Sequence, residues 1–502
     1  MPVTLGSPGV YIQEVPGGSR AITGVATAIA AFVGRALRGP VNEPVKISSL
    51  TEFERIFGGL WRQSGLGYAV RDYFLNGGGT AVIIRLGGGA TRARLDAGGL
   101  SLEAYGPGSW GDGLTVKVLH PAEPDAAEVS TAQGVEKGDL FHLTVDDGKG
   151  PREDFFNVTV ADGPRRVDLV LQSSRLVRPT KDKPLPVGRP VEKTYKVESA
   201  ARGSDGGALA QADYGPLRTV LATVDAFTIL CLPPSAPTGD LPDPVWQDAL
   251  RYCLERRAFL LVDPPATRTA ATLLAWLQAQ GLTGEMARNG ALYFPRIRRP
   301  DPLRDGAFGE FVPCGAVAGV MARTDAARGV WKAPAGIDSG LAGVSGLTIP
   351  LTDADNSDLN TRGVNCLRTF RDTGSVVWGA RTLRGADVLA DEYRYVPVRR
   401  LTLFLEESLW RGSQWVVFEP NDEPLWAQIR TMLGGFMQDL FRQGAFQGKS
   451  PREAYFVRCD AETTTRFDID RGVVNIVVGF APVKPAEFVV ISIQQKTAEA
   501  AG

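Results

Sequence analysis

Histidine is almost missing from this chain: His120 and His142 are its two copies among 502 residues. A Ser-His-Asp hydrolase needs an imidazole to accept the serine proton, and the GxSxG turn that often carries such a serine is missing as well. His142 alternates with Phe141, Leu143 and Val145, which predicts that it faces solvent. The sequence therefore argues against hydrolysis by a catalytic triad.

Cysteine is scarce and scattered. The number is odd and no CxxC pair occurs, which argues against a disulfide framework and against a zinc ribbon. A reducing compartment fits this usage best. The five residues are Cys231, Cys253, Cys314, Cys366 and Cys459.

Long apolar runs and an excess of one charge are also missing. No stretch reaches the roughly 18 apolar residues of a membrane span, and the uncharged stretch at 21–34 matches a secretory signal poorly. The 55 basic and 56 acidic residues give a net charge of -1, so no bulk field attracts nucleic acid or an anionic membrane. We expect no nucleic acid partner, no direct membrane insertion, and recognition through local surfaces.

What the chain does contain is enough apolar sequence for several cores, with 44% hydrophobic and 22% charged residues. We expect an N-terminal extended arm at 1–20, the first part of a core at 21–97, a β-rich insertion domain at 98–202, an α/β domain at 203–375, a C-terminal α+β domain at 376–485 and a C-terminal arm at 486–502.

The N-terminal segments differ in pattern. PGVYIQEV at 8–15 is a short extended run that cannot form a core alone. Apolar runs with helical spacing follow at 26–34 and 48–58, where Ser48 or Ser49 is a candidate helix cap. AVIIRL at 81–86 then predicts a buried strand.

Two further regions follow the first core segment. The insertion has short alternating strands, expected at 114–119, 141–145, 155–160 and 167–171. In the α/β region, strands at 226–233 and 258–265 alternate with helices at 246–256 and 271–280. That alternation predicts a partly parallel sheet.

The clearest single helix is expected from Asn421 to Phe441, with an apolar stripe at helical spacing and Gly444 beyond its end. Strands are expected at 473–480 and 487–493. The second is apolar on both faces, so it lies inside a sheet or enters another subunit.

Several motifs resemble ligand sites and fail on spacing. GAFQGKS at 444–450 is one residue short of a P-loop and is read as a helix cap and turn. DADNSDLN at 353–360 lacks the calcium-loop glycine and glutamate and is read as a solvated acidic loop. PRIRRP at 295–300 is read as an exposed loop with ion-pair partners. Glu406 and Glu407 are read as a strand pair on opposite faces. We expect no catalytic residue, no metal site and no cofactor.

An enzyme remains as a remote alternative, with a carboxylate and arginine site in the α/β domain around Asp225, Asp263 and Arg296. A closed ring, such as a baseplate or cap component, is a further alternative.

The most specific motifs are spread over nearly the whole chain outside about 120–200. They are PGVYIQEV, FVGRALRGP at 32–40, FERIFGG, NGGGTAVIIRL, PGSWGDGLTV, GVWKAPAG at 329–336, LNTRGVNCLRTF at 359–370, VWGARTL at 377–383, RRL at 399–401, FEPND at 418–422 and APVKPAEFVV at 481–490. In kind and order they resemble the tail sheath proteins of contractile phage tails, R-type bacteriocins and extracellular contractile injection systems.

The resemblance implies a structural subunit that polymerises helically around an inner tube and contracts from a metastable extended state. The α/β domain at 203–375 is then subtilisin-like without the protease triad, the insertion lies on the outer surface, and 376–485 is an inner domain. An injection system or phage-tail-like particle is favoured, with a bacteriophage tail sheath as the alternative. Implied partners are other copies of the chain, an inner tube protein, and baseplate and cap or terminator proteins. Assembly is expected in the bacterial cytoplasm, before release of the particle.

The resemblance also implies strand exchange between subunits and contacts of the 421–441 helix with the tube. The candidate exchange residues are Val10, Ile12, Val15, Phe488, Val490 and Ile491. The candidate tube contacts are Gln428, Arg430 and Gln438.

Overall fold

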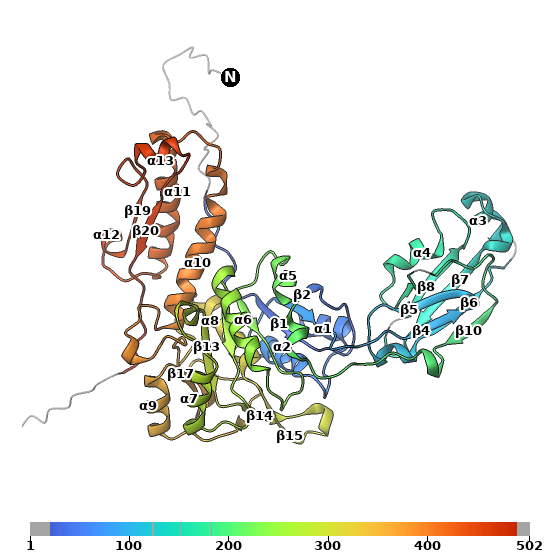
Figure 1. Ribbon diagram of the computed structural model, residues 1–502, viewed down its shortest axis with the longest axis horizontal. Helices are drawn as coiled ribbons and strands as arrows, with labels where there is room; N and C mark the ends of the chain where they lie inside the picture. Colours follow the sequence, from blue (N-terminus) through green and yellow to red (C-terminus); the bar gives the residue numbers. More distant parts are fainter. Residues whose placement is uncertain (1–20, 123–124, 151, 182, 489–502) are drawn as a thin grey trace, which may run out of the picture. The chain divides into compact units, whose positions relative to one another are not determined.

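The computed structural model describes residues 21–122, 125–150, 152–181 and 183–488. This part of the chain forms two units (Figure 1). The larger is Ala26–Arg399, and the smaller combines the residues just before Ala26 with those from Arg400 onward. No helix in the described ranges is long and apolar enough to cross a membrane.

The larger unit is built on an eight-stranded sheet with the order β18-β17-β13-β12-β11-β1-β3-β2. The six inner strands are parallel, so that Ala30 lies beside Ala81 on one side and Ile229 on the other. The two edge strands are antiparallel to their neighbours. This confirms the expected α/β class with a partly parallel sheet, although β1, β2 and β3 come from before the expected range 203–375. The strands are β1 (Ala30–Gly34), β2 (Pro44–Ile47), β3 (Ala81–Arg85), β11 (Ile229–Cys231), β12 (Phe259–Val262), β13 (Gly290–Phe294), β17 (Val364–Phe370) and β18 (Gly374–Val377).

Helices cover both faces of this sheet. On one face, Leu217, Trp246 and Leu273 from three helices share a core with Leu230 and Leu260 of the sheet. The helices of that face are α5 (Leu217–Ala222), α6 (Asp243–Arg256), α7 (Ala270–Ala279) and α9 (Asp353–Thr361); α2 (Leu66–Leu75) and α8 (Cys314–Arg328) cover the other face, and α1 (Leu50–Phe57) follows β2.

Helices α2 and α8 approach closely because α8 carries glycine at the crossing. A Cβ on Gly315 would lie 2.1 Å from the Ala69 carbonyl oxygen, and one on Gly319 would lie 2.6 Å from that of Tyr73. No real Cβ makes such contacts, so glycine at these two positions permits the packing.

Three sequence interpretations in this unit are wrong. Residues 30–34 of the run expected to be helical form the central strand β1, because all five are buried on a two-faced sheet. The expected loop at 295–300 contains strand β14 (Ile297–Pro300), which pairs with β15 (Phe308–Phe311) and β16 (Gly346–Leu347). The expected acidic loop at 353–360 is helix α9, because Thr352 caps it and Asp353 and Asp355 lie in its first turn.

The insertion has its own core between two small sheets, with orders β10-β6-β7-β8 and β4-β5-β9. One expected strand, 167–171, is instead helix α4 and a 3-10 turn, since the buried Val167 and Leu171 are spaced four apart. The elements are β4 (Arg94–Ala97), β5 (Leu100–Ala104), β6 (Thr115–Leu119), α3 (Asp125–Gln133), β7 (Phe141–Asp146), β8 (Glu153–Val158), α4 (Val167–Val170), β9 (Val177–Pro179) and β10 (Lys193–Lys196).

His142 is half-buried rather than solvent-facing. Its Nδ1 accepts the backbone N–H of Asn157 at 3.0 Å, and burial lowers its pKa. The imidazole therefore has a structural role, because it links the paired strands β7 and β8 of the insertion.

The smaller unit packs two long helices against a two-stranded sheet. Asp422 caps the second helix by accepting the Leu425 N–H at 3.1 Å, and Gly444 follows the helix end with φ 83°. Glu406 and Glu407 lie on a helix, not on a strand as expected, and Glu407 pairs with Arg411 one turn later. The elements are α10 (Val396–Gly412), which enters this unit at Arg400, α11 (Glu423–Arg442), α12 (Pro451–Ala454), β19 (Tyr455–Arg458), α13 (Arg466–Asp470) and β20 (Val477–Phe480).

Candidate functional site

Two residues of the enzyme alternative, Arg296 and Asp263, belong to a buried polar network. Arg296 donates to the Asp240 carboxylate at 2.7 Å and to the Pro264 carbonyl at 2.8 Å. Asp263 accepts the backbone N–H of Cys314, the first residue of α8, at 3.0 Å. Its carboxylate therefore satisfies a free helix N-terminus, where negative charge is stabilised.

This network is poorly arranged for catalysis. Asp263 and Arg296 are each 4% exposed, and burial raises the pKa of the Asp263 carboxyl to about 7. The adjoining cavity measures about 100 Å³. Asp225 precedes β11, whereas Asp263 follows β12, so the two lie at opposite ends of parallel strands. The described residues contain no group of three potential metal ligands.

The two-stranded sheet of the smaller unit is the most distinctive candidate surface. Tyr455 pairs with Phe480 and Arg458 with Val477 in antiparallel register. In the described ranges each strand has one sheet neighbour, so both outer edges present backbone N–H and C=O groups without a strand partner. A sheet of two strands is marginally stable by itself.

One face of this sheet is anchored on α11. Val457 and Val478 pack against the core that contains Ile429 and Leu433. The Tyr455 hydroxyl donates to Oε1 of Gln438 at 2.9 Å. The helix therefore holds the sheet in place while its edges stay open.

The opposite face is apolar and exposed. The side chains of Phe456 and Val477 are 46% and 44% exposed. The ring of Phe456 covers its cross-strand partner Gly479, and Arg458 lies 5.2 Å from the ring centroid. An exposed apolar face next to open edges is suited to further strands.

The predicted strand-exchange residues lie mostly outside the described part of the chain, namely Val10, Ile12, Val15, Val490 and Ile491. Phe488 is described, is 74% exposed and belongs to no strand. The segment just before Ala26 is held on the smaller unit, where the Val25 N–H donates to the Ser408 hydroxyl at 3.1 Å. Gly24 lies so close to Phe404 that a Cβ would be 2.8 Å from its ring.

The three candidate tube contacts differ in their surroundings. Gln428 is exposed and lines a groove of about 450 Å³ with Ile22 and Trp415. Arg430 donates to the Cys459 carbonyl and pairs with Glu423, and Gln438 accepts from Tyr455. Of the three, Gln428 is the one whose side chain faces open surface.

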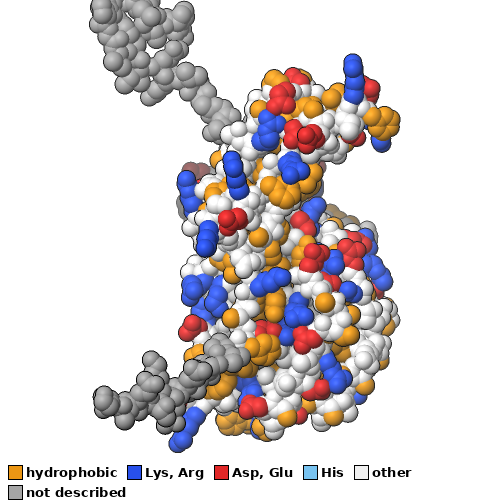
Figure 2. All heavy atoms as spheres, turned by 90° about the vertical axis from the view of Figure 1, so that its left-hand side faces the viewer, with side chains coloured by type: hydrophobic (Ala, Val, Ile, Leu, Met, Phe, Trp, Pro, Cys, Tyr) orange, Lys and Arg blue, Asp and Glu red, His pale blue; other side chains and the backbone are white. Residues whose placement is uncertain are grey.

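Charge does not single out a nucleic acid surface. On the face shown in Figure 2, Lys and Arg side chains are interspersed with Asp and Glu, and neither sign forms a continuous patch. A phosphate backbone requires a concentrated basic surface. This face therefore fits protein contacts better.

Sequence reasoning missed strand β19 and the conformation of Phe418, which has φ 72°. The alternation in YFVR at 455–458 was a usable signal for the strand. A phenylalanine with positive φ leaves no local signal, because that conformation is rare for bulky residues.

Comparisons with known proteins match this chain to phage tail sheath proteins. A family model for the phage tail sheath protein central domain matches residues 245–383, and one for the phage tail sheath C-terminal domain matches 390–496. The tail sheath protein of Burkholderia phage BcepMu is 25% identical over 461 residues, which cover 88% of this chain and 87% of that protein.

Two further comparisons differ in how much of the chain they cover. The tail sheath protein of Enterobacteria phage T4 is 27% identical over 230 residues, and the matched stretch covers 45% of this chain and 33% of that protein. The sheath complex of the extracellular contractile injection system PVC, in its contracted state, has a TM-score of 0.61. It is 23% identical, covers 98% of this chain and 99% of that chain, and shares the fold. The chain belongs to the phage tail sheath family.

Proposed function

We propose that the protein is a structural subunit of a contractile sheath, in which copies polymerise helically around an inner tube. The sheath would shorten from a metastable extended state and drive the tube through a target envelope. The observation that carries this proposal is the two-stranded sheet with two open edges, found in a chain of the tail sheath family.

Strand exchange would complete that sheet. An N-terminal arm with Val10, Ile12 and Val15 from one neighbour would pair with one edge. A C-terminal arm with Phe488, Val490 and Ile491 from another neighbour would pair with the other. Main-chain hydrogen bonds supply affinity in such strand addition, and alternate side chains supply specificity. The exposed Phe456 and Val477 offer an apolar face for those side chains.

Helical growth follows from the kind of contact. An arm that enters a different surface of the next copy makes a heterologous interface, and such interfaces form open helical assemblies when the rotation does not close a ring. Contraction then requires two packings of the same folded subunit, related by rigid-body rotation. The arms would keep neighbours linked during that change.

The exposed side of α11 is the proposed tube-facing surface, with Gln428 as the leading contact. Arg430 and Gln438 remain candidates, but each would have to give up a bond within the subunit, to the Cys459 carbonyl or to Tyr455. Baseplate and cap or terminator proteins are the proposed partners at the two ends of the sheath.

The α/β domain would act as a rigid, subtilisin-like body without protease chemistry, and we propose no enzymatic activity and no cofactor. Asp263 and Arg296 support this, because they are committed to a helix end and to an ion pair. We favour an extracellular contractile injection system or phage-tail-like particle, assembled in the bacterial cytoplasm and then released. A bacteriophage tail sheath is the alternative.

The test is negative-stain electron microscopy of the purified full chain at rising concentration, alone and with a candidate inner tube protein. The chain truncated after Pro485 is the comparison. We expect striated hollow tubes from the full chain and shorter or no tubes from the truncated chain. Discs of one fixed size would favour a closed ring, and particles that stay small with the tube protein present would contradict the proposal.

A further inference from the structure

A tight turn between α10 and α11 presents an aromatic side chain at a conformational cost. The turn spans 416–419 and is closed by the Glu419 N–H, which donates to the Val416 carbonyl at 3.1 Å. Phe418, at its third position, has φ 72°. Turns with positive φ at this position favour glycine, and a residue with a Cβ is destabilised there.

The phenylalanine gains nothing from its own subunit to offset that cost. Its side chain is 103% exposed, and that of Val417 beside it is 61% exposed. Strained backbone that displays an apolar side chain to solvent indicates a contact with another surface.

The surroundings of the turn are acidic. From Ser413 to Ile429 the sequence contains Glu419, Asp422 and Glu423 and no lysine or arginine. Glu423 pairs with Arg430 and Asp422 caps α11, so Glu419 is the acidic group that belongs to the turn itself. A matching surface therefore needs an apolar hollow with basic side chains at its rim.

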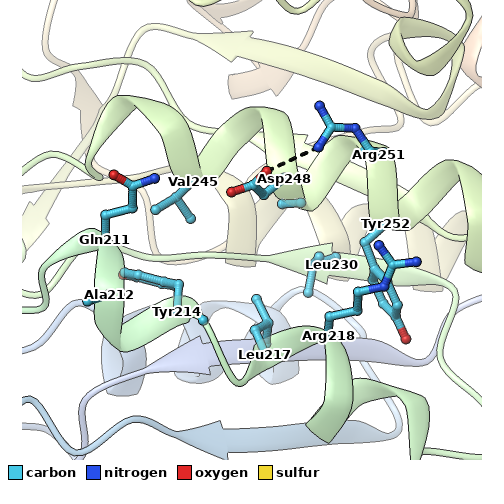
Figure 3. A pocket seen from close by; sticks show the side chains of 12 residues that line it. Gln211, Ala212, Tyr214, Leu217, Arg218, Leu230, Val245, Asp248, Arg251 and Tyr252 are labelled. Carbon is cyan, nitrogen blue, oxygen red and sulfur yellow. Dashed lines mark hydrogen bonds and ion pairs between the residues drawn. The ribbon is translucent and has the colours of Figure 1, made fainter.

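The larger unit has such a hollow, with a volume of about 490 Å³, between α5, α6 and the sheet (Figure 3). Leu217, Leu230, Val245 and Ala249 are buried and contribute apolar surface. Figure 3 shows Val245 and Asp248 on one helix, facing Leu217 on the other.

The polar atoms of the floor are turned away from an incoming group. Tyr214 and Tyr252 line the hollow, but solvent does not reach their hydroxyls, which have no hydrogen-bond partner within the described ranges. These two residues therefore present ring surface, which suits an aromatic occupant.

Arginine stands at the rim. The side chains of Arg218 and Arg251 are 66% and 55% exposed, and Arg218 pairs with Glu255 at 2.5 Å. Arg251 pairs with Asp248 at 3.3 Å, an exposed pair of the kind that contributes little stability. Its guanidinium is therefore able to exchange partners at low cost.

We propose that the turn at 416–419 of one subunit docks in this hollow on a second copy, with Phe418 against the tyrosine rings and Glu419 paired with Arg251. Because the turn and the hollow are different surfaces, the contact is heterologous and propagates from copy to copy. The inference rests on the proposed sheath function and adds a second subunit contact besides strand exchange.

Cysteine cross-linking tests the contact directly, because all five native cysteines are buried. The full chain with Phe418→Cys and Ala212→Cys, at the mouth of the hollow, is oxidised at rising concentration and run on a denaturing gel. We expect a ladder of dimers and higher species. The control combines Phe418→Cys with Val187→Cys. Val187 lies on the insertion and is as exposed as Phe418, so this pair should give at most a faint ladder.

Electron microscopy of the same samples distinguishes a failure of the docking contact from a failure of the proposed sheath function. Tubes without a ladder would overturn the docking contact and leave the sheath function intact. A cross-link confined to single chains would also overturn it. Failure to form any assembly or ladder with the tube protein present would count against both.

Substitutions add a test with opposite effects on folding and assembly. Phe418→Gly relieves the positive φ, so we expect equal or higher thermal stability but an approximately tenfold higher concentration for assembly. Glu419→Arg and Arg251→Glu should each weaken assembly, and their combination should restore it. Unchanged assembly in Phe418→Gly, or no restoration in the double variant, would contradict the pairing.

Discussion

The ring of Phe456 lies across the α-carbon of Gly479, its cross-strand partner, on the outward face of the two-stranded sheet. A Cβ at position 479 would lie 2.3 Å from Cε1 of that ring. The glycine therefore allows the aromatic ring to cover the strand and to form the apolar face on which added strands would pack.

Replacing this glycine should disturb assembly more than folding. In Gly479→Ala the ring of Phe456 must swing outward, and because it is already 46% exposed we expect a stability change within about 1 kcal/mol. We expect a higher concentration for tube formation, measured by sedimentation. Gly346→Ala, at a strand glycine with open space around it, is the matched control and should behave as the native chain.

The two glutamines on α11 should give different phenotypes. Gln438→Ala removes the acceptor of the Tyr455 hydroxyl and should lower the unfolding free energy by about 1 kcal/mol. Gln428→Ala changes an exposed side chain, so its stability should be unchanged while co-sedimentation with tube protein falls. Equal tube binding by Gln428→Ala and the native chain would remove this residue from the proposed tube surface.

The crossing of α2 and α8 should not tolerate a methyl group. In Gly315→Ala the new Cβ would meet the Ala69 carbonyl at 2.1 Å, and neither backbone yields easily. We expect a loss of about 1–3 kcal/mol or more in denaturant unfolding. Gly138→Ala in the insertion, with nothing within 4 Å of a Cβ, is the control and should change stability little.

Stability should depend on pH through Asp263. Burial raises the pKa of its carboxyl to about 7, whereas an aspartate in the unfolded chain has a pKa of about 3.9. The native state therefore holds the proton more tightly. This contribution to stability is complete below about pH 4 and is lost as the pH rises through about 7.

Asp263→Asn removes that titration and keeps an oxygen that can accept the Cys314 N–H. Denaturant unfolding at about pH 5 and about pH 8 should show a smaller difference in the variant than in the native chain. The exposed Asp338→Asn serves as control. A native chain that gains stability between these two pH values through Asp263 would refute the assigned direction.

The sequence predicted those elements whose own residues carry a repeated pattern. Helix α11 has an apolar stripe, a cap at Asp422 and Gly444 beyond its end, and it lies within two residues of the expected bounds. The alternation of strands and helices from β11 to α7 likewise indicated the parallel sheet. These signals are local, so a single chain reveals them.

The features that were missed depend on distant partners. Strand β1 was obscured by its alanines, because its five residues become buried only when β3 and β11 flank it. Arg299 lies in a strand and pairs at 3.0 Å with Asp72, more than two hundred positions away in the sequence. Phe418 adopts a positive φ, which phenylalanine disfavours, and no sequence pattern indicates this conformation.

Helical reconstruction of the assembled polymer by electron cryo-microscopy would show whether other subunits complete the two-stranded sheet. We expect a sheet of four strands that includes β19 and β20, with one added strand from the N-terminal arm of one neighbour and one from the C-terminal arm of another. A polymer in which both outer edges remain without a strand partner would contradict this expectation.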